Sequence, residues 1–162
     1  MPVIKITLIN ISFFTLILSA CGIFLSEGEK LYDQGKYEEA IVEFDKYIEA
    51  NRYEKKPRLL RADSYIKLGI PEKALYDLFL VKELRLQTDG VLNTPLLDLV
   101  HGNYYVAVEE FDWAITHYSK VILNDGEYLI DAYMNRGSAY ESTGDYQKAQ
   151  ADFNMADKLA NK

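Results

Sequence analysis

The stretch that decides the fold is DAYMNRGSAYESTGDYQKAQADFNMA, residues 131–156. A small residue, Gly137, precedes the turn glycine Gly144 by seven positions. Asp145 follows the turn and is a residue type that caps helix N-termini. Phe153 then supplies a large apolar side chain in the second half of the stretch. The order predicts two helices joined by a tight turn.

The same landmarks occur four times along the chain. Alanines recur at spacings of 34, 40 and 35 residues: Ala40, Ala74, Ala114 and Ala149. Small residues repeat these spacings at Gly28, Ala62, Gly102 and Gly137, and turn positions do so at Gly35, Gly69, Glu109 and Gly144. Large residues follow each alanine by four places (Phe44, Leu78, Tyr118, Phe153) or precede each turn (Leu31, Tyr65, Tyr105, Tyr140). A fixed period favours a solenoid of helix pairs over a plain helical bundle.

These landmarks resemble the tetratricopeptide repeat, a helix–turn–helix unit of about 34 residues. The resemblance covers nearly all of residues 22–162. It implies an all-α fold, a right-handed α-solenoid of four units with about eight antiparallel helices. The units fall at about 22–54, 55–88, 95–128 and 129–162, with six extra residues near Gln87 to Thr94. The family's proline after the second helix is missing in all four units. Polar residues precede the small landmark at Glu27, Arg61, His101 and Arg136.

Helix ends and the outer face of the last unit carry further signals. Ser26 with Glu29 forms a capping-box pattern, and Pro71 and Pro95 suit first helical positions. Gln150 and Asp157 stand where earlier units have mostly apolar residues. A polar outer face is what the end of a repeat array needs for solubility. We therefore expect the array to end with the fourth unit.

The N-terminal residues 1–20 read MPVIKITLINISFFTLILSA. One cation, Lys5, precedes an apolar run of 13 residues, which is shorter than the ~20 needed to span a membrane as a helix. This pattern predicts a secretory signal peptide. Leu18-Ser19-Ala20-Cys21 resembles the lipobox of bacterial lipoproteins. The resemblance implies that Cys21 is alkylated by diacylglycerol, that cleavage falls before it, and that its new amine is acylated by a fatty acid such as palmitate. The alternatives are an ordinary signal peptide with a chance cysteine, or a short membrane helix.

On this interpretation residues 1–20 are the signal peptide, 21–26 a lipidated tether, and 27–162 the repeat domain. Gly22 stands where enterobacterial lipoproteins retained at the inner membrane carry Asp. The resemblance therefore favours a bacterial outer membrane, with the side of the membrane left open.

Composition excludes several kinds of function. With 18 basic and 25 acidic residues the net charge is −7, which argues against nucleic acid as a partner. One cysteine can form neither a disulfide framework nor a thiol-rich metal site. The two histidines, His101 and His117, belong to different predicted helices, and a structural or surface role is expected for both. We expect no cofactor, no metal site and no catalytic residues.

The resemblance also implies a concave groove lined by the first helix of each unit. Its places hold Leu25, Glu29, Tyr32, Leu59, Asp63, Ile66, Leu96, Leu99, Asn103, Val106 and Met134. Family members that clamp a peptide carboxylate use Asn, Lys and Arg at places where this chain has Glu29, Asp63, Leu96 and Val100. Apolar residues with acidic neighbours instead favour an amphipathic or basic segment of a protein partner. The alternative is that several of these residues pack between units.

Trp113 is the chain's single tryptophan, and its counterparts in the other units are polar: Glu39, Lys73 and Lys148. It is a candidate binding hot spot, with packing over a neighbouring helix end as the alternative. Together these features predict a membrane-anchored, non-catalytic scaffold in outer-membrane, pilus or cell-wall assembly. The alternatives are a small-ligand-sensing envelope subunit and an envelope hydrolase.

Overall fold

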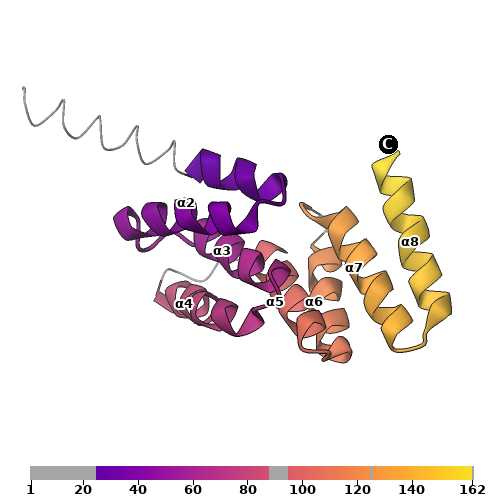
Figure 1. Ribbon diagram of the computed structural model, residues 1–162. Helices are drawn as coiled ribbons and strands as arrows, with labels where there is room; N and C mark the ends of the chain where they lie inside the picture. Colours follow the sequence, from indigo (N-terminus) through magenta and orange to yellow (C-terminus); the bar gives the residue numbers. More distant parts are fainter. Residues whose placement is uncertain (1–24, 88–94, 125, 162) are drawn as a thin grey trace, which may run out of the picture.

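The computed structural model describes residues 25–87, 95–124 and 126–161, and all regular secondary structure in these ranges is helical (Figure 1). The first helix covers residues 25–33. It is followed by α2 (Tyr37–Ala50), α3 (Lys56–Lys67), the 3-10 turn η1 (Pro71–Lys73), α4 (Ala74–Gln87), α5 (Pro95–Ala107), α6 (Phe111–Leu123), α7 (Leu129–Ser142) and α8 (Tyr146–Ala160). The helices form four successive pairs along a curved array (Figure 1). The predicted all-α solenoid is therefore confirmed.

We call these pairs units one to four. The predicted signal peptide, the lipobox with Cys21, and the six-residue insertion before Thr94 lie outside the described residues. Among the described residues, no helix combines the length and the apolar character that crossing a membrane requires.

The turn inside each unit has the same backbone geometry. Positive φ angles of 73°, 75°, 61° and 83° occur at the four predicted turn positions, Gly35, Gly69, Glu109 and Gly144. The N–H one residue later donates to the carbonyl of the large residue before the turn, as from Asp145 to Tyr140. This is the Schellman arrangement that ends helices with a left-handed residue. Glycine enters that region freely, whereas Glu109 carries the steric cost of a Cβ atom.

The two helices of a unit cross where the small landmark meets the large one. A Cβ atom added to Gly102 would lie 2.3 Å from Cε1 of Tyr118, and one added to Gly137 would lie 2.5 Å from Cε1 of Phe153. Real Cβ atoms do not approach ring carbons so closely. Glycine at these positions is therefore what allows an aromatic ring to lie flat across the first helix, as the repeat pattern predicts.

Helix starts agree only in part with the sequence signals. The side chain of Asp145 accepts a hydrogen bond from the backbone N–H of Lys148 at 3.2 Å, so the predicted cap of α8 is confirmed. Pro95 is the first residue of α5, also as predicted. The capping box at Ser26 is wrong in position, because the first helix already includes Leu25.

The core consists of three clusters, one in unit one and its junction with α3, one across units two and three, and one across units three and four. Leu96, at the start of α5, packs against all three. A single side chain therefore joins the separate cores near the middle of the array.

The junction between units two and three differs from the other two. Ile41 of α2 is buried, whereas its counterpart in α4, Leu75, is 46% exposed, and Phe79 is 59% exposed. The helix α5 packs mainly against α6 and α3 and hardly touches α4. The six-residue insertion thus coincides with a change in how the units stack, which leaves an apolar face of α4 open.

Candidate partner-binding groove

The first helices of units two, three and four enclose a hollow of about 270 Å³ on the concave side. It is lined by Ile66, Lys67, Asn103, Val106, Ala107, Tyr118, Asn135 and Ser138. Ile66, Val106 and Ala107 supply aliphatic surface, and the polar groups are two carboxamides, one phenol, one serine and one lysine. Such a surface suits a protein segment with an apolar side chain flanked by polar groups.

A chain of buried hydrogen bonds forms the floor of the groove. The hydroxyl of Tyr32 donates to Asp63, and Nδ2 of Asn103 donates to the other oxygen of Asp63 at 2.6 Å. Oδ1 of Asn103 accepts from the Tyr118 hydroxyl at 2.8 Å and from Nδ2 of Asn135 at 3.1 Å. The chain thereby links the first helices of all four units. Because buried polar groups are costly when unpaired, it fixes the relative positions of these helices.

Titration of the phenols agrees with this arrangement. Burial, together with the charge of Asp63, raises the pKa of the Tyr32 hydroxyl far above its usual range. The same two causes raise the pKa of the Tyr118 hydroxyl. Both hydroxyls therefore remain protonated donors at neutral pH.

Several predicted groove residues do reach the concave surface. Ile66, Asn103 and Val106 line the hollow, and Met134 of α7 is 44% exposed. Glu29, by contrast, is engaged in an ion pair with Lys56, whose Nζ lies 2.7 Å from its carboxylate. The exposed apolar part of the predicted groove is therefore centred on α5 and α7.

Other predicted groove residues belong to the core. Leu59 is 1% exposed and Leu99 is 8% exposed, and both lie within the clusters that join successive units. Leu96 packs among all three clusters, and Leu25 packs against the cluster of unit one. The prediction that these four leucines face a partner is wrong for Leu59 and Leu99. Leu59 and Leu99 instead pack between units, which is the alternative that the sequence left open.

Tyr118 and Asn135 line the hollow but are not among the predicted groove residues. Tyr118 was identified only as the large residue of its unit. Asn135 carried a usable signal, because its counterparts in units two and three are the apolar residues Leu60 and Val100. Unit one has Ser26 at this place, so Asn135 departs from an apolar residue in two of the other three units, and the carboxamide indicates a specific hydrogen-bonding role.

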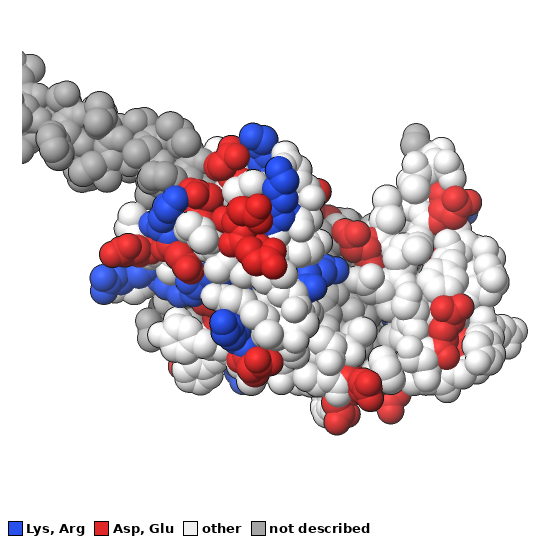
Figure 2. Space-filling view, viewed as in Figure 1, with Lys and Arg blue, Asp and Glu red and all other residues white. Residues whose placement is uncertain are grey.

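Charge is distributed unevenly along the array. Residues 25–87 contain 12 basic and 13 acidic residues, a net charge of −1, whereas residues 95–162 contain 5 basic and 11 acidic residues, a net charge of −6. Figure 2 shows lysines and arginines gathered on units one and two, while the same face of units three and four carries mainly carboxylates. Burial also raises the pKa of the Asp131 carboxyl at the start of α7, an effect that Lys67 opposes. The acidic half of the array favours a basic partner.

Trp113 lies outside the groove, at the start of α6. Its ring stacks on that of Tyr105, with centroids 6.1 Å apart, yet the residue remains 57% exposed. Tyr105 in turn stacks on His117, and His117 on His101 at 5.0 Å. Trp113 thus packs over the end of α5, which is the alternative that the sequence left open, and its role as a binding hot spot stays a prediction.

The histidines occupy a structural setting. Nδ1 of His117 lies 2.8 Å from a carboxylate oxygen of Asp98. Burial, followed by the neighbouring His117, lowers the pKa of His101 to about 4. Within the described ranges, no three or more histidine, cysteine or acidic residues gather in a way that could hold a metal ion.

Comparison with known proteins finds similarity to tetratricopeptide repeats. Residues 130–162, which make up unit four, match the family described as Tetratricopeptide repeat. In sequence the chain is 29% identical over 102 residues to outer dynein arm-docking complex subunit 4 of Xenopus laevis, which covers 63% of this chain and 18% of that protein. The chain therefore spans less than a fifth of the curated relative that it matches.

Solved structures are similar over most of the chain. The crystal structure of MamA has a TM-score of 0.61 at 22% identity and covers 92% of this chain and 88% of that one. The NMR structure of the first TPR domain of human RPAP3 has a TM-score of 0.55 at 20% identity, covering 85% and 95%. The first TPR of Spaghetti (RPAP3) bound to HSP90 peptide SRMEEVD has a TM-score of 0.51 at 19% identity, covering 88% and 94%. These likenesses show that the chain has the tetratricopeptide fold.

Proposed function

We propose that this chain is a membrane-anchored, non-catalytic scaffold that binds protein partners in its concave groove. The observation that carries the proposal is the hollow between α3, α5 and α7, where aliphatic side chains lie beside polar groups above a fixed floor of hydrogen bonds. A rigid floor lowers the entropic cost of ordering a bound segment. A structural neighbour, the first TPR of Spaghetti, is described as bound to an HSP90 peptide, which supports a peptide segment as the occupant.

The partner segment is amphipathic with basic residues. Its apolar side chain enters the hollow against Ile66 and Val106, and its basic residues face the acidic half of the array. The carboxylate-clamp mode is disfavoured here because Asp63 is buried and committed to Tyr32 and Asn103.

The anchor is Cys21, acylated after removal of residues 1–20. Since the first helix already includes Leu25, only three residues separate it from Cys21, and the four Cα–Cα steps between the two residues reach at most about 14 Å when fully extended. Such a tether holds the array against the bilayer surface of the bacterial envelope, most simply at the outer membrane. Roles in outer-membrane, pilus or cell-wall assembly fit this position.

The groove is tested by exposed apolar residues, since the buried leucines would disturb folding. The double substitution Val106→Glu and Met134→Glu places charges on the groove side of α5 and α7. Val42→Glu is the matched control, because Val42 is 51% exposed on α2, away from the hollow. Detergent-solubilised membranes are passed over each tagged protein and captured proteins are identified by mass spectrometry.

We expect specific proteins to be captured by the unchanged chain and by Val42→Glu, and lost with the double variant. Helical circular dichroism of the three proteins should coincide. Equal capture by the double variant refutes the groove. Stabilisation of the unchanged chain by a metabolite, with no protein captured, points instead to a small-ligand sensor.

The anchor is tested separately by metabolic labelling with an alkyne-tagged fatty acid. We expect label on the unchanged chain and none on Cys21→Ala, with the variant released from membranes by washing. Label on both forms, or on neither, contradicts acylation at Cys21.

A further inference from the structure

Units two and four each place a lysine over the tyrosine that precedes the turn. Nζ of Lys73 lies 5.5 Å from the ring centroid of Tyr65, and Nζ of Lys148 lies 5.2 Å from that of Tyr140. Both distances are within the range of cation–π attraction. The lysine stands at the same position of each unit, one residue before the landmark alanine. The fold therefore has a recurrent place where a cation lies on an aromatic ring.

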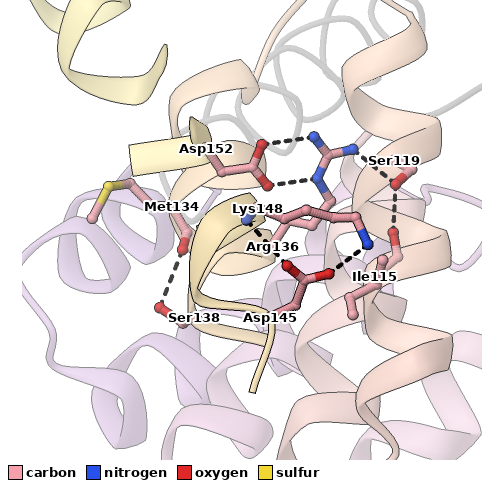
Figure 3. A network of polar contacts seen from close by, with 8 residues as sticks. All are labelled: Ile115, Ser119, Met134, Arg136, Ser138, Asp145, Lys148 and Asp152. Atoms are coloured by element: carbon pink, nitrogen blue, oxygen red, sulfur yellow. Dashed lines mark hydrogen bonds and ion pairs between the residues drawn. The ribbon is translucent and has the colours of Figure 1, made fainter. Parts of the chain in front are cut away.

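Unit four shows this place in complete form. The carboxylate of Asp145 caps α8 and also forms an ion pair with Lys148, whose Nζ lies 2.5 Å away (Figure 3). The cation is thus held by a ring on one side and by the carboxylate at the turn on the other. Both partners come from residues next to the tight turn.

Unit three has the ring and the carboxylate but no cation. Trp113 replaces the lysine and stacks on Tyr105, and Glu110 stands where unit four has Asp145. Glu110 makes no side-chain cap hydrogen bond to α6. In the described part of the chain, no lysine or arginine pairs with Glu110 or with its exposed neighbours Glu109 and Asp112.

The tryptophan ring is held in place and remains accessible. Its inner face rests on Tyr105, which is itself stacked on His117, so the ring is supported by a column of aromatic side chains. The residue is 57% exposed, which leaves ring surface open to solvent. Tryptophan is the aromatic residue that attracts a cation most strongly. Because its ring is uncharged and largely apolar, it can also pack against neighbouring side chains.

We propose that the α5–α6 turn is a second docking point, which binds an arginine or lysine side chain of a protein partner. The cation lies on the open face of Trp113 and pairs with Glu110, as Lys148 lies on Tyr140 and pairs with Asp145 within unit four. The net charge of −6 over residues 95–162 draws a basic segment to this end of the array. The surface is separate from the groove and does not depend on the groove being occupied.

The probe is a fluorescein-labelled hexa-arginine peptide, titrated with the full chain in non-ionic detergent and followed by fluorescence anisotropy. Trp113 is the chain's only tryptophan, so its emission reports the position of unlabelled peptide directly. We expect a saturable rise in anisotropy together with a saturable change in tryptophan emission. Saturable anisotropy without a change in emission overturns the proposal, because the peptide then binds elsewhere.

The decisive variant is Trp113→Lys, which recreates the arrangement of units two and four and supplies the cation internally. Since those units carry lysine at this position, the variant is compatible with the fold. We expect binding to weaken by about fivefold or more, and Trp113→Phe, which keeps an aromatic face, to weaken it by no more than about threefold. Unchanged binding by Trp113→Lys refutes the docking point.

The carboxylate is tested by Glu110→Gln against Asp157→Asn, which removes the same charge from an exposed position on α8. We expect Glu110→Gln to weaken binding by about threefold and Asp157→Asn by less than about 1.5-fold, since distant surface charges are screened. An equal loss in the two variants shows that the peptide responds to net charge alone, and this also refutes the proposal.

Discussion

The helix crossing in unit three provides the sharpest test of the packing described above. Gly102 lies beneath the ring of Tyr118, and a Cβ atom at this position would stand 2.3, 2.6 and 2.8 Å from three ring carbons. Tyr118 is only 1% exposed and its hydroxyl is bonded to Asn103, so the ring has little freedom to move aside. We therefore expect Gly102→Ala to force the two helices apart.

The magnitude follows from two opposing effects. Overpacking a core costs about 1–3 kcal/mol, and the locked ring places this site near the upper end. Replacing glycine by alanine within a helix returns about 1 kcal/mol. The net loss of unfolding free energy is therefore about 2 kcal/mol, equivalent to roughly 6 °C in Tm for a domain of this size.

Unit two shows how the clash is avoided, since it has Ala62 and Leu78 at the two corresponding positions. The assay is urea unfolding, followed by circular dichroism, of four proteins: the unchanged chain, Gly102→Ala, Tyr118→Leu and the double variant. In the Tyr118→Leu background, Gly102→Ala should be neutral or stabilising, which gives a coupling free energy of about 2 kcal/mol or more. A Gly102→Ala variant as stable as the unchanged chain, with no coupling, refutes this account of the crossing.

Three further predictions concern buried polar groups, each measured by urea unfolding. The pKa of His101 is about 4 in the folded state and about 6.5 when unfolded, so the unfolded state takes up the proton first. Stability should fall by up to about 3 kcal/mol as the pH drops from 6.5 to 4, and His101→Phe should remove that part of the pH dependence. Asp152→Asn should cost about 2 kcal/mol, because Asp152 holds the Arg136 guanidinium through two hydrogen bonds of 2.7 and 2.8 Å; a loss below about 0.5 kcal/mol would contradict this. Asn103→Leu should cost about 2 kcal/mol or more, because it leaves the buried Asp63 carboxylate without one of its two donors; an unchanged midpoint would show that the groove floor does not hold the helices together.

The features that could be predicted from the sequence are those that depend on contacts within a single unit, namely the turn and the helix crossing. The turn angles at Gly35 and Gly144 and the crossing of Gly137 with Phe153 follow from residues no more than 16 positions apart. Each such relation is repeated four times, so the spacing of a few residue types is enough to reveal it. Even the non-glycine turn at Glu109 was located in this way, because its neighbours keep the register.

What could not be predicted depends on how units sit relative to one another. Leu59 and Leu99 occupy groove places in the repeat pattern, but the stacking of the units turns them into the core. The hydrogen-bond chain from Tyr32 to Asn135 joins residues more than 100 positions apart, and only one of its links, between Asn103 and Tyr118, lies within a unit. No period in the sequence encodes the rotation between units, so a groove position and a core position look alike until the array is assembled.

The position immediately before the small landmark residue carries different side chains in different units, although the crossing of the two helices is the same. In units two and four an arginine there is clasped by an aspartate 16 residues later, Arg61 by Asp77 and Arg136 by Asp152 (Figure 3). In unit three the same two positions hold His101 and His117, stacked with centroids 5.0 Å apart.

An arginine–carboxylate clasp joins opposite charges at neutral pH. In unit three, burial and the neighbouring His117 lower the pKa of His101, so His101 resists protonation and its contribution to stability is lost as the pH falls. Unit three also carries the tryptophan in place of lysine and borders the one junction where α4 is left open. The departures from the repeat therefore concentrate in a single unit. Unit three keeps the small landmark Gly102 and the large landmark Tyr118, so its two helices still cross as in the other units. The unit can therefore differ from the others in charge, in sensitivity to acid and in its exposed surface without losing the fold.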